Sequence, residues 1–164
     1  MNSLLETHAE VAAVLAGFAS IAAVLRRPLS PVEHQRFLSL LFSALIQIVV
    51  CLVPVWLSII NVTGAVLWRS AALLALVLTL AHIMVLIFIP IRTLGASNFT
   101  IINAPVNYAI LAMSVVVLGS LVLTIIGAPI APGFALYYLA CLLGLIVNFF
   151  VFADLIIRGE DQAK

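Results

Sequence analysis

The sequence consists of long apolar stretches separated by short polar segments. Five such stretches cover residues 4–25, 37–60, 66–91, 107–126 and 134–157. Each has 20 or more residues, and at about 1.5 Å per residue a helix of that length crosses a hydrocarbon core of roughly 30 Å. No stretch alternates strictly between apolar and polar residues, as the strands of a membrane β-barrel do. The pattern therefore predicts an all-α, polytopic membrane helix bundle with five transmembrane helices.

The basic residues predict the orientation of this bundle. Five crossings place the loop after the first stretch, the loop after the third and the C-terminal tail on one side. That side carries six of the seven basic residues, namely Arg26, Arg27, Arg36, Arg92, Arg158 and Lys164, whereas the other side carries Arg69. Because segments rich in Lys and Arg stay in the cytoplasm, we expect the N-terminus outside and the C-terminus inside. Residues 1–158 are expected to form a single transmembrane helical domain of the cytoplasmic (inner) membrane, and residues 159–164 a short cytoplasmic tail.

Composition excludes several classes of protein. The chain is 66% apolar and 8% charged, with a mean hydropathy of +1.36, whereas soluble domains are roughly 45–50% apolar and about 25% charged. Its seven basic and six acidic residues are too few to cover the surface of a soluble fold. This argues against a soluble enzyme, a nucleic-acid-binding protein and a disordered chain. Cys51 and Cys141 lie within apolar stretches without a CxxC motif, so we interpret them as packing residues.

Most of the predicted helices carry a stripe of small or polar residues spaced three and four apart, and residues so spaced share a helix face. The stripes are Glu6, Glu10, Ala13, Gly17 and Ser20 in the first helix, Ser39, Ser43, Gln47 and Cys51 in the second, Ala75, Thr79 and His82 in the third, Tyr137, Cys141, Gly144 and Asn148 in the fifth, and a weaker pair, Ser120 and Thr124, in the fourth. In lipid, such stripes mark where helix backbones approach and hydrogen bonds cross. Ala13, Gly17 and Ser20 are the predicted helix-packing residues, either within the bundle or against a neighbouring chain.

Three polar side chains are predicted to lie at a similar depth. Gln47, His82 and Asn148 are each ten residues from a predicted cytoplasmic helix end, which is about 15 Å into the bilayer and near its midplane. One interpretation is a layer of hydrogen bonds that holds the helices together. The other is a constriction or a binding site for an ion, a proton or a small polar solute, because ionisable groups are costly to keep inside a membrane.

The histidines do not predict a cofactor. A b-type haem at His82 would need a second axial ligand at the same depth, and His8 and His34 are expected near the outer end and in a cytoplasmic loop. The string from Glu6 to Glu10 does not predict a metal site, because His8 points about 200° away from Glu6 around the helix. We expect no cofactor and no metal, and interpret His82 as a neutral, hydrogen-bonded packing residue.

A charge cluster is predicted at the outer face. Glu6 and Glu10 share one face of the first helix, and Arg69 is expected at the same membrane boundary. The plainer interpretation is a salt bridge between Arg69 and these carboxylates. The functional alternative is an acidic vestibule that attracts cations.

The sequence lacks the features expected of an enzyme. It shows no nucleophile paired with a base, no paired carboxylates at a membrane surface and no glycine loop that would cradle a phosphate. We therefore expect a non-enzymatic helix-packing subunit, either accessory or for assembly, of a membrane complex. The alternative is a homo-oligomeric channel or small-solute or ion carrier with the polar layer as its filter. The expected partners are the lipid bilayer and either further copies of the chain or another membrane subunit, not nucleic acid.

Overall fold

The regular structure of the chain is helical throughout the described residues. The computed structural model describes residues 2–25, 31–88 and 104–161. The helices are α1 (Asn2–Leu25), α2 (Pro31–Ile59), α3 (Gly64–His82), the π-helix η1 (Ile83–Phe88), α5 (Ala104–Ile126) and α6 (Gly133–Asp161). Five segments are long and apolar enough to span a membrane, over Ser3–Ile21, Phe37–Ile59, Gly64–Val85, Tyr108–Ile126 and Gly133–Ala153. The prediction of an all-helical chain with five such helices is confirmed.

Several helix bounds differ from those predicted. α2 begins at Pro31, six residues before the predicted start, because proline suits the first turn of a helix, where its missing N–H is not needed. α6 continues to Asp161, so the first part of the expected tail is helical. The α-helical part of the third stretch ends at His82 and continues as the π-helix. Arg26, Arg27, Arg92 and Lys164, which carry the predicted orientation, lie outside the described residues.

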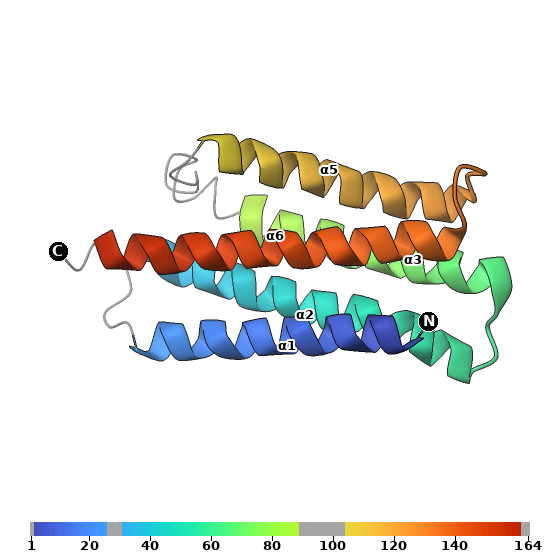
Figure 1. Cartoon of the computed structure of the whole chain (residues 1–164), viewed down its shortest axis with the longest axis horizontal. Coiled ribbons are helices and arrows are strands. Elements are labelled where there is room, and N and C mark those ends of the chain that lie inside the picture. The colour runs from blue at the N-terminus through green and yellow to red at the C-terminus, as the bar shows by residue number, and fades with distance from the viewer. Residues whose placement is uncertain (1, 26–30, 89–103, 162–164) are drawn as a thin grey trace.

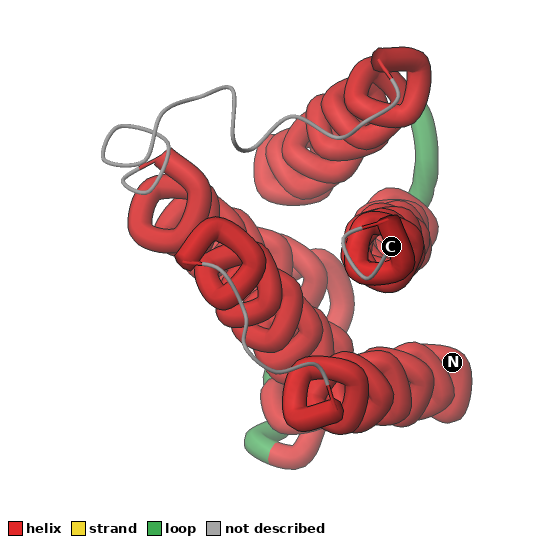
Figure 2. Tube along the Cα trace, turned by 90° about the vertical axis from the view of Figure 1, so that its left-hand side faces the viewer, coloured by secondary structure: helices red, strands yellow, loops and turns green. Residues whose placement is uncertain are grey.

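The helices form a bundle in which α6 is central. They run along a common long axis, with the two chain ends at opposite ends of the bundle (Figure 1). Seen along that axis, α6 lies between α1 and α5 (Figure 2). It packs against α1, α2, α3 and α5, whereas the main contacts of α1 among the described residues are with α2 and α6. α6 therefore connects the first helices of the chain to the later ones.

Two helices, α2 and α5, end in the same type of cap at the same end of the bundle (Figure 1). After α2, Asn61 has a φ of 63°, and the N–H groups of Asn61 and Val62 donate to the carbonyls of Ser58 and Leu57. After α5, Gly127 has a φ of 68°, and the N–H groups of Gly127 and Ala128 donate in the same way to the carbonyls of Thr124 and Leu123. Both are Schellman motifs, which require a residue that tolerates the left-handed region.

The inward face of α1 is made almost entirely of alanine. Its buried residues are Leu5, His8, Ala9, Ala12, Ala16 and Ala19. Side chains this small allow the α1 backbone to lie close to its neighbours. Small residues are typical of helix interfaces in lipid, because there the hydrophobic effect does not drive helices together and close packing has to.

Candidate functional site

Four helices line a partly open cavity of about 130 Å³ whose wall is mainly apolar but carries several polar side chains. Its lining comes from α2, α3, α5 and α6 together with the first residue of η1. The polar side chains in the wall are Ser43, Gln47, Thr79, His82 and Ser114, and the remainder of the wall is aliphatic apart from Gly144. Among the described side chains, no Asp, Glu, Lys or Arg lines it. Gln47 and His82, two members of the predicted polar layer, thus share one cavity.

Gln47 joins α2 to α6 at the wall of this cavity. Its Nε2 donates to the backbone carbonyl of Cys141 at 2.8 Å and lies 3.5 Å from Cys51 Sγ. Its Oε1 occupies the space over Gly144, where a Cβ would come within 2.6 Å of it. The amide therefore fits only because residue 144 lacks a side chain, and the donor half of Gln47 is already used.

Asn148 lies beside the cavity but not in its wall. The Ser43 hydroxyl donates to Asn148 Oδ1 at 2.5 Å, and Asn148 is 4% exposed. Ser43 itself lines the cavity. Asn148 is therefore connected to the other two polar residues through one hydroxyl and forms a second polar link between α2 and α6.

The fold brings the predicted polar layer together in part. Gln47 and His82 lie in the wall of one cavity, and Asn148 is joined to that wall through Ser43, whereas the common depth of the three residues stays a prediction. The prediction placed all three near one depth by counting His82 from Arg92, which lies outside the described residues. What brings Gln47 and His82 together is the cavity between their helices.

His82, in the cavity wall, has a buried hydrogen-bonding group without a partner among the described residues. Its Nδ1 is buried and has no hydrogen-bond partner. Ile83, the next residue, starts a six-residue π-helix, a rare geometry that occurs mostly as single turns and often at functional sites. The sequence from Ile83 to Phe88 contains no Gly or Pro that would have indicated this change of helix type.

The stripes of α2 and α6 meet face to face along an antiparallel seam. We define the α2–α6 seam as Ser43, Gln47, Cys51, Tyr137, Cys141, Gly144 and Asn148. Ser43 meets Asn148, and Gln47 meets Cys51 of its own helix and Cys141 and Gly144 of α6. Further along, the Tyr137 hydroxyl donates to the carbonyl of Val50 at 2.6 Å. The spacing in each helix indicated these faces, and only the fold shows that they oppose each other.

Pro54 explains the hydrogen bond from Tyr137. Proline has no N–H, so Pro54 leaves the carbonyl four residues earlier, that of Val50, without its helical donor. Tyr137 is fully buried and packs against Trp68, with 5.8 Å between ring centroids. A hydroxyl from α6 thus satisfies a carbonyl that Pro54 freed in α2, a partnership that the sequence analysis did not predict.

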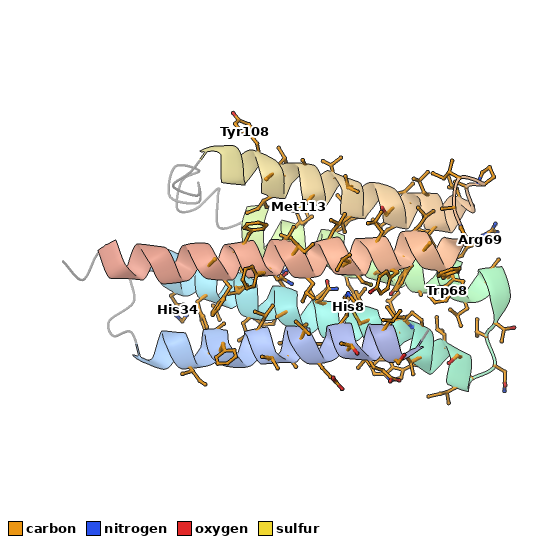
Figure 3. All side chains as sticks on the ribbon, viewed as in Figure 1. His8, His34, Trp68, Arg69, Tyr108 and Met113 are labelled. Carbon is orange, nitrogen blue, oxygen red and sulfur yellow. The ribbon has the colours of Figure 1, made fainter. Side chains whose placement is uncertain are left out.

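The three members of the predicted outer-face charge cluster lie apart. Glu6 and Glu10 are exposed on α1, whereas Arg69 on α3 packs its guanidinium over Gly127 at the end of α5. The cation there lies near the negative end of the α5 dipole. Arg69 and Trp68 lie at the end of the bundle where α1 begins (Figure 3). Among the described side chains, no ion pair joins Arg69 to Glu6 or Glu10.

His8 lies on the opposite side of α1 from these carboxylates. It is buried, its Nδ1 bonds to the Leu4 carbonyl at 2.8 Å, and its ring contacts Tyr138 edge-on with 5.0 Å between centroids. Among the residues whose side chains are described, no group of three or more His, Cys, Asp or Glu could hold a metal ion.

The predicted packing stripe of α1 faces away from the bundle. Ala13 and Gly17 are exposed, and a Cβ at Gly17 would meet nothing within 4 Å. Ser20 is partly buried and donates to the Ala16 carbonyl of its own helix at 2.8 Å. The residues that pack α1 within the chain are on another face of the helix, offset from Ala13 and Gly17. They are Leu5, His8, Ala9, Ala12, Ala16 and Ala19. The predicted stripe is therefore unpartnered within the described part of the chain.

Comparison with known proteins gave no match. No protein-family model matches the sequence, and no curated protein and no solved structure is significantly similar to it.

Proposed function

We propose that this protein is a non-enzymatic, multi-pass subunit of a membrane complex and that α1 is the helix through which it assembles. The observation that carries this proposal is the outward face of α1, which presents Glu6, Glu10, Ala13 and Gly17 away from the bundle. The opposite face of the same helix already packs against α2 and α6. A helix with one packed and one unpacked small-residue face suits a position between its own bundle and a partner.

The carboxylates strengthen this argument. Glu10 lies about 10 Å along the helix from Ser3, within a segment apolar enough to cross a membrane. An acidic side chain at that depth is costly when it faces hydrocarbon, and no described side chain forms an ion pair with it. The occupant we propose is a membrane helix of another protein that presents a basic or hydrogen-bond-donating side chain to Glu10. Gly17 would let the two backbones approach closely.

The hydrogen bonds of the α2–α6 seam favour this function over an open filter within one chain. A filter needs its polar groups to face water, whereas the amide donors of a packing layer are paired. The Gln47 amide donates to the Cys141 carbonyl and the Asn148 amide oxygen accepts from Ser43. These two members of the predicted polar layer behave as links between helices.

The test replaces Gly17 by a residue that blocks close approach. We expect Gly17→Leu and Glu10→Gln to reduce the mass of the particle extracted in mild detergent from the native membrane, because the partner is lost. Gly119→Leu is the matched control, since Gly119 on α5 is also exposed with nothing within 4 Å of a Cβ position. An unchanged mass for both α1 variants would contradict the proposal. A particle containing only further copies of this chain would replace the foreign partner with a homo-oligomer.

We further infer an orientation with the N-terminus outside and the C-terminus in the cytoplasm, in the inner membrane. Six of the seven basic residues follow the first, third and fifth apolar segments. They support this orientation, because cytoplasmic loops carry an excess of Lys and Arg. A fluorescent protein fused after Lys164 is expected to fluoresce, and alkaline phosphatase at the same position to be inactive. Active phosphatase there would reverse the orientation.

A further inference from the structure

The cavity between α2, α3, α5 and α6 is separate from the outward face of α1, and α1 contributes no residue to its wall. A role of this cavity would therefore be independent of the proposed assembly role of α1. Its polar groups are gathered from three helices, with Ser43 and Gln47 from α2, Thr79 and His82 from α3, and Ser114 from α5. Packing alone needs no such convergence, because aliphatic side chains would fill the same space.

The wall offers hydrogen-bonding capacity that the protein itself leaves unused. Ser114 and Ser43 donate to the Ile110 carbonyl and to Asn148, which leaves the lone pairs of both hydroxyl oxygens available as acceptors. The Gln47 amide donates through Nε2, so its Oε1 is a further acceptor. The neutral imidazole of His82 carries one donor and one acceptor, and its Nδ1 is unpaired.

Charge and size restrict what could enter. Because none of the described side chains that line the cavity is acidic or strongly basic, an ion there would meet no counter-charge from them in a low-dielectric environment. The volume of about 130 Å³ is close to the roughly 150 Å³ of a protein cavity that binds benzene, a molecule of six non-hydrogen atoms. A neutral molecule with about four to six non-hydrogen atoms matches this space.

The helix geometry beside His82 is a separate observation. Ile83 both lines the cavity and begins the π-helix. A π-turn costs regular hydrogen-bond geometry and is found frequently where a binding site needs the wider turn. Here the π-helix begins directly after the histidine of the cavity wall.

We propose that this cavity binds a small uncharged solute of about four to six non-hydrogen atoms that both donates and accepts hydrogen bonds, of the chemical class of short amides and alcohols. His82 and the hydroxyls of Thr79 and Ser114 contact the solute. The aliphatic part of the wall packs against its carbon atoms.

The chain contains three histidines, which gives a direct experiment. The full chain, labelled with ¹³C,¹⁵N-histidine in lipid nanodiscs, gives one set of imidazole resonances for each of His8, His34 and His82, assigned with single His→Gln variants. Titration with acetamide is expected to shift only the His82 resonances, and to saturate. Acetate, which has the same number of non-hydrogen atoms and a negative charge, is expected to leave them unchanged.

Two matched variants locate the effect. Ser114→Phe fills the cavity and is expected to raise the apparent Kd for acetamide by about tenfold or more. Val115→Phe places the same side chain at the neighbouring exposed position and is expected to leave the Kd unchanged. The His8 resonances show whether each variant keeps its fold, and Ser114→Val, which removes only the hydroxyl, replaces Ser114→Phe if they change. Absence of a saturable His82 shift, an equal response to acetate, or an equal loss in Val115→Phe would overturn the proposal.

Discussion

Replacing Tyr137 by alanine is expected to be the most destabilising single change in the α2–α6 seam. Tyr137 is fully buried in the hydrophobic core, and truncating a buried aromatic side chain leaves a cavity that costs about 3–5 kcal/mol. Tyr137→Phe keeps the ring and removes only the hydroxyl that bonds to Val50. We expect it to cost about 0.6–2 kcal/mol, the range of a hydrogen bond between membrane helices.

The loss in Tyr137→Phe is expected to depend on Pro54. In Pro54→Ala, the new N–H of residue 54 can donate to the Val50 carbonyl, which then no longer relies on Tyr137. Removing the hydroxyl in that background should cost half as much or less, and the difference is the coupling energy of a double-mutant cycle. The free energy of unfolding is measured by titrating the protein with sodium dodecyl sulfate in mixed micelles. Equal costs in both backgrounds would show that Tyr137 does not compensate for Pro54.

The second large effect is expected at adjacent alanines of α1. Ala12 is fully buried against the rest of the bundle, so Ala12→Leu must push the helices apart and should lower the free energy of unfolding by about 1–3 kcal/mol. Ala13 is exposed on the face that carries Gly17. Ala13→Leu should leave the unfolding free energy of the isolated chain within about 0.5 kcal/mol of its original value.

The same two variants separate the inner face of α1 from its outer face. The unfolding free energy is measured on the purified chain, and the mass of the extracted particle on native membranes. Ala12→Leu changes the first quantity, and Ala13→Leu is expected to change only the second. If Ala13→Leu destabilised the isolated chain as much as Ala12→Leu, the assignment of the two faces would be wrong.

The helices themselves could be predicted because hydropathy is a local property. Each apolar segment of about 20 residues must satisfy its own backbone hydrogen bonds in lipid, and a helix does so without reference to the remainder of the chain. The bounds were less accurate. Residues 31–36 were expected in a loop but are helical. Pro31 starts this helix, because the first helical position does not need the N–H that proline lacks.

The candidate site was predicted in part. The periodic spacing of Ser43 and Gln47 in α2, and of Cys141 and Asn148 in α6, placed each set on one face, and these faces supply the hydrogen bonds between the two helices. The contacts across the seam could not be predicted, because residue spacing gives the direction of a side chain around its own helix but not which helix lies opposite.

The sequence by itself determined that the chain forms five long apolar helices, since length and hydropathy require nothing from tertiary contacts. Only the tertiary structure decided which face of α1 is inside, because its two neighbouring small-residue stripes differ little in composition and only the fit against α2 and α6 distinguishes them. The tertiary structure also paired Tyr137 with the carbonyl freed by Pro54 and placed His82 in the wall of a cavity. Both depend on residues far apart in the chain, and the packing of whole helices fixes their distance.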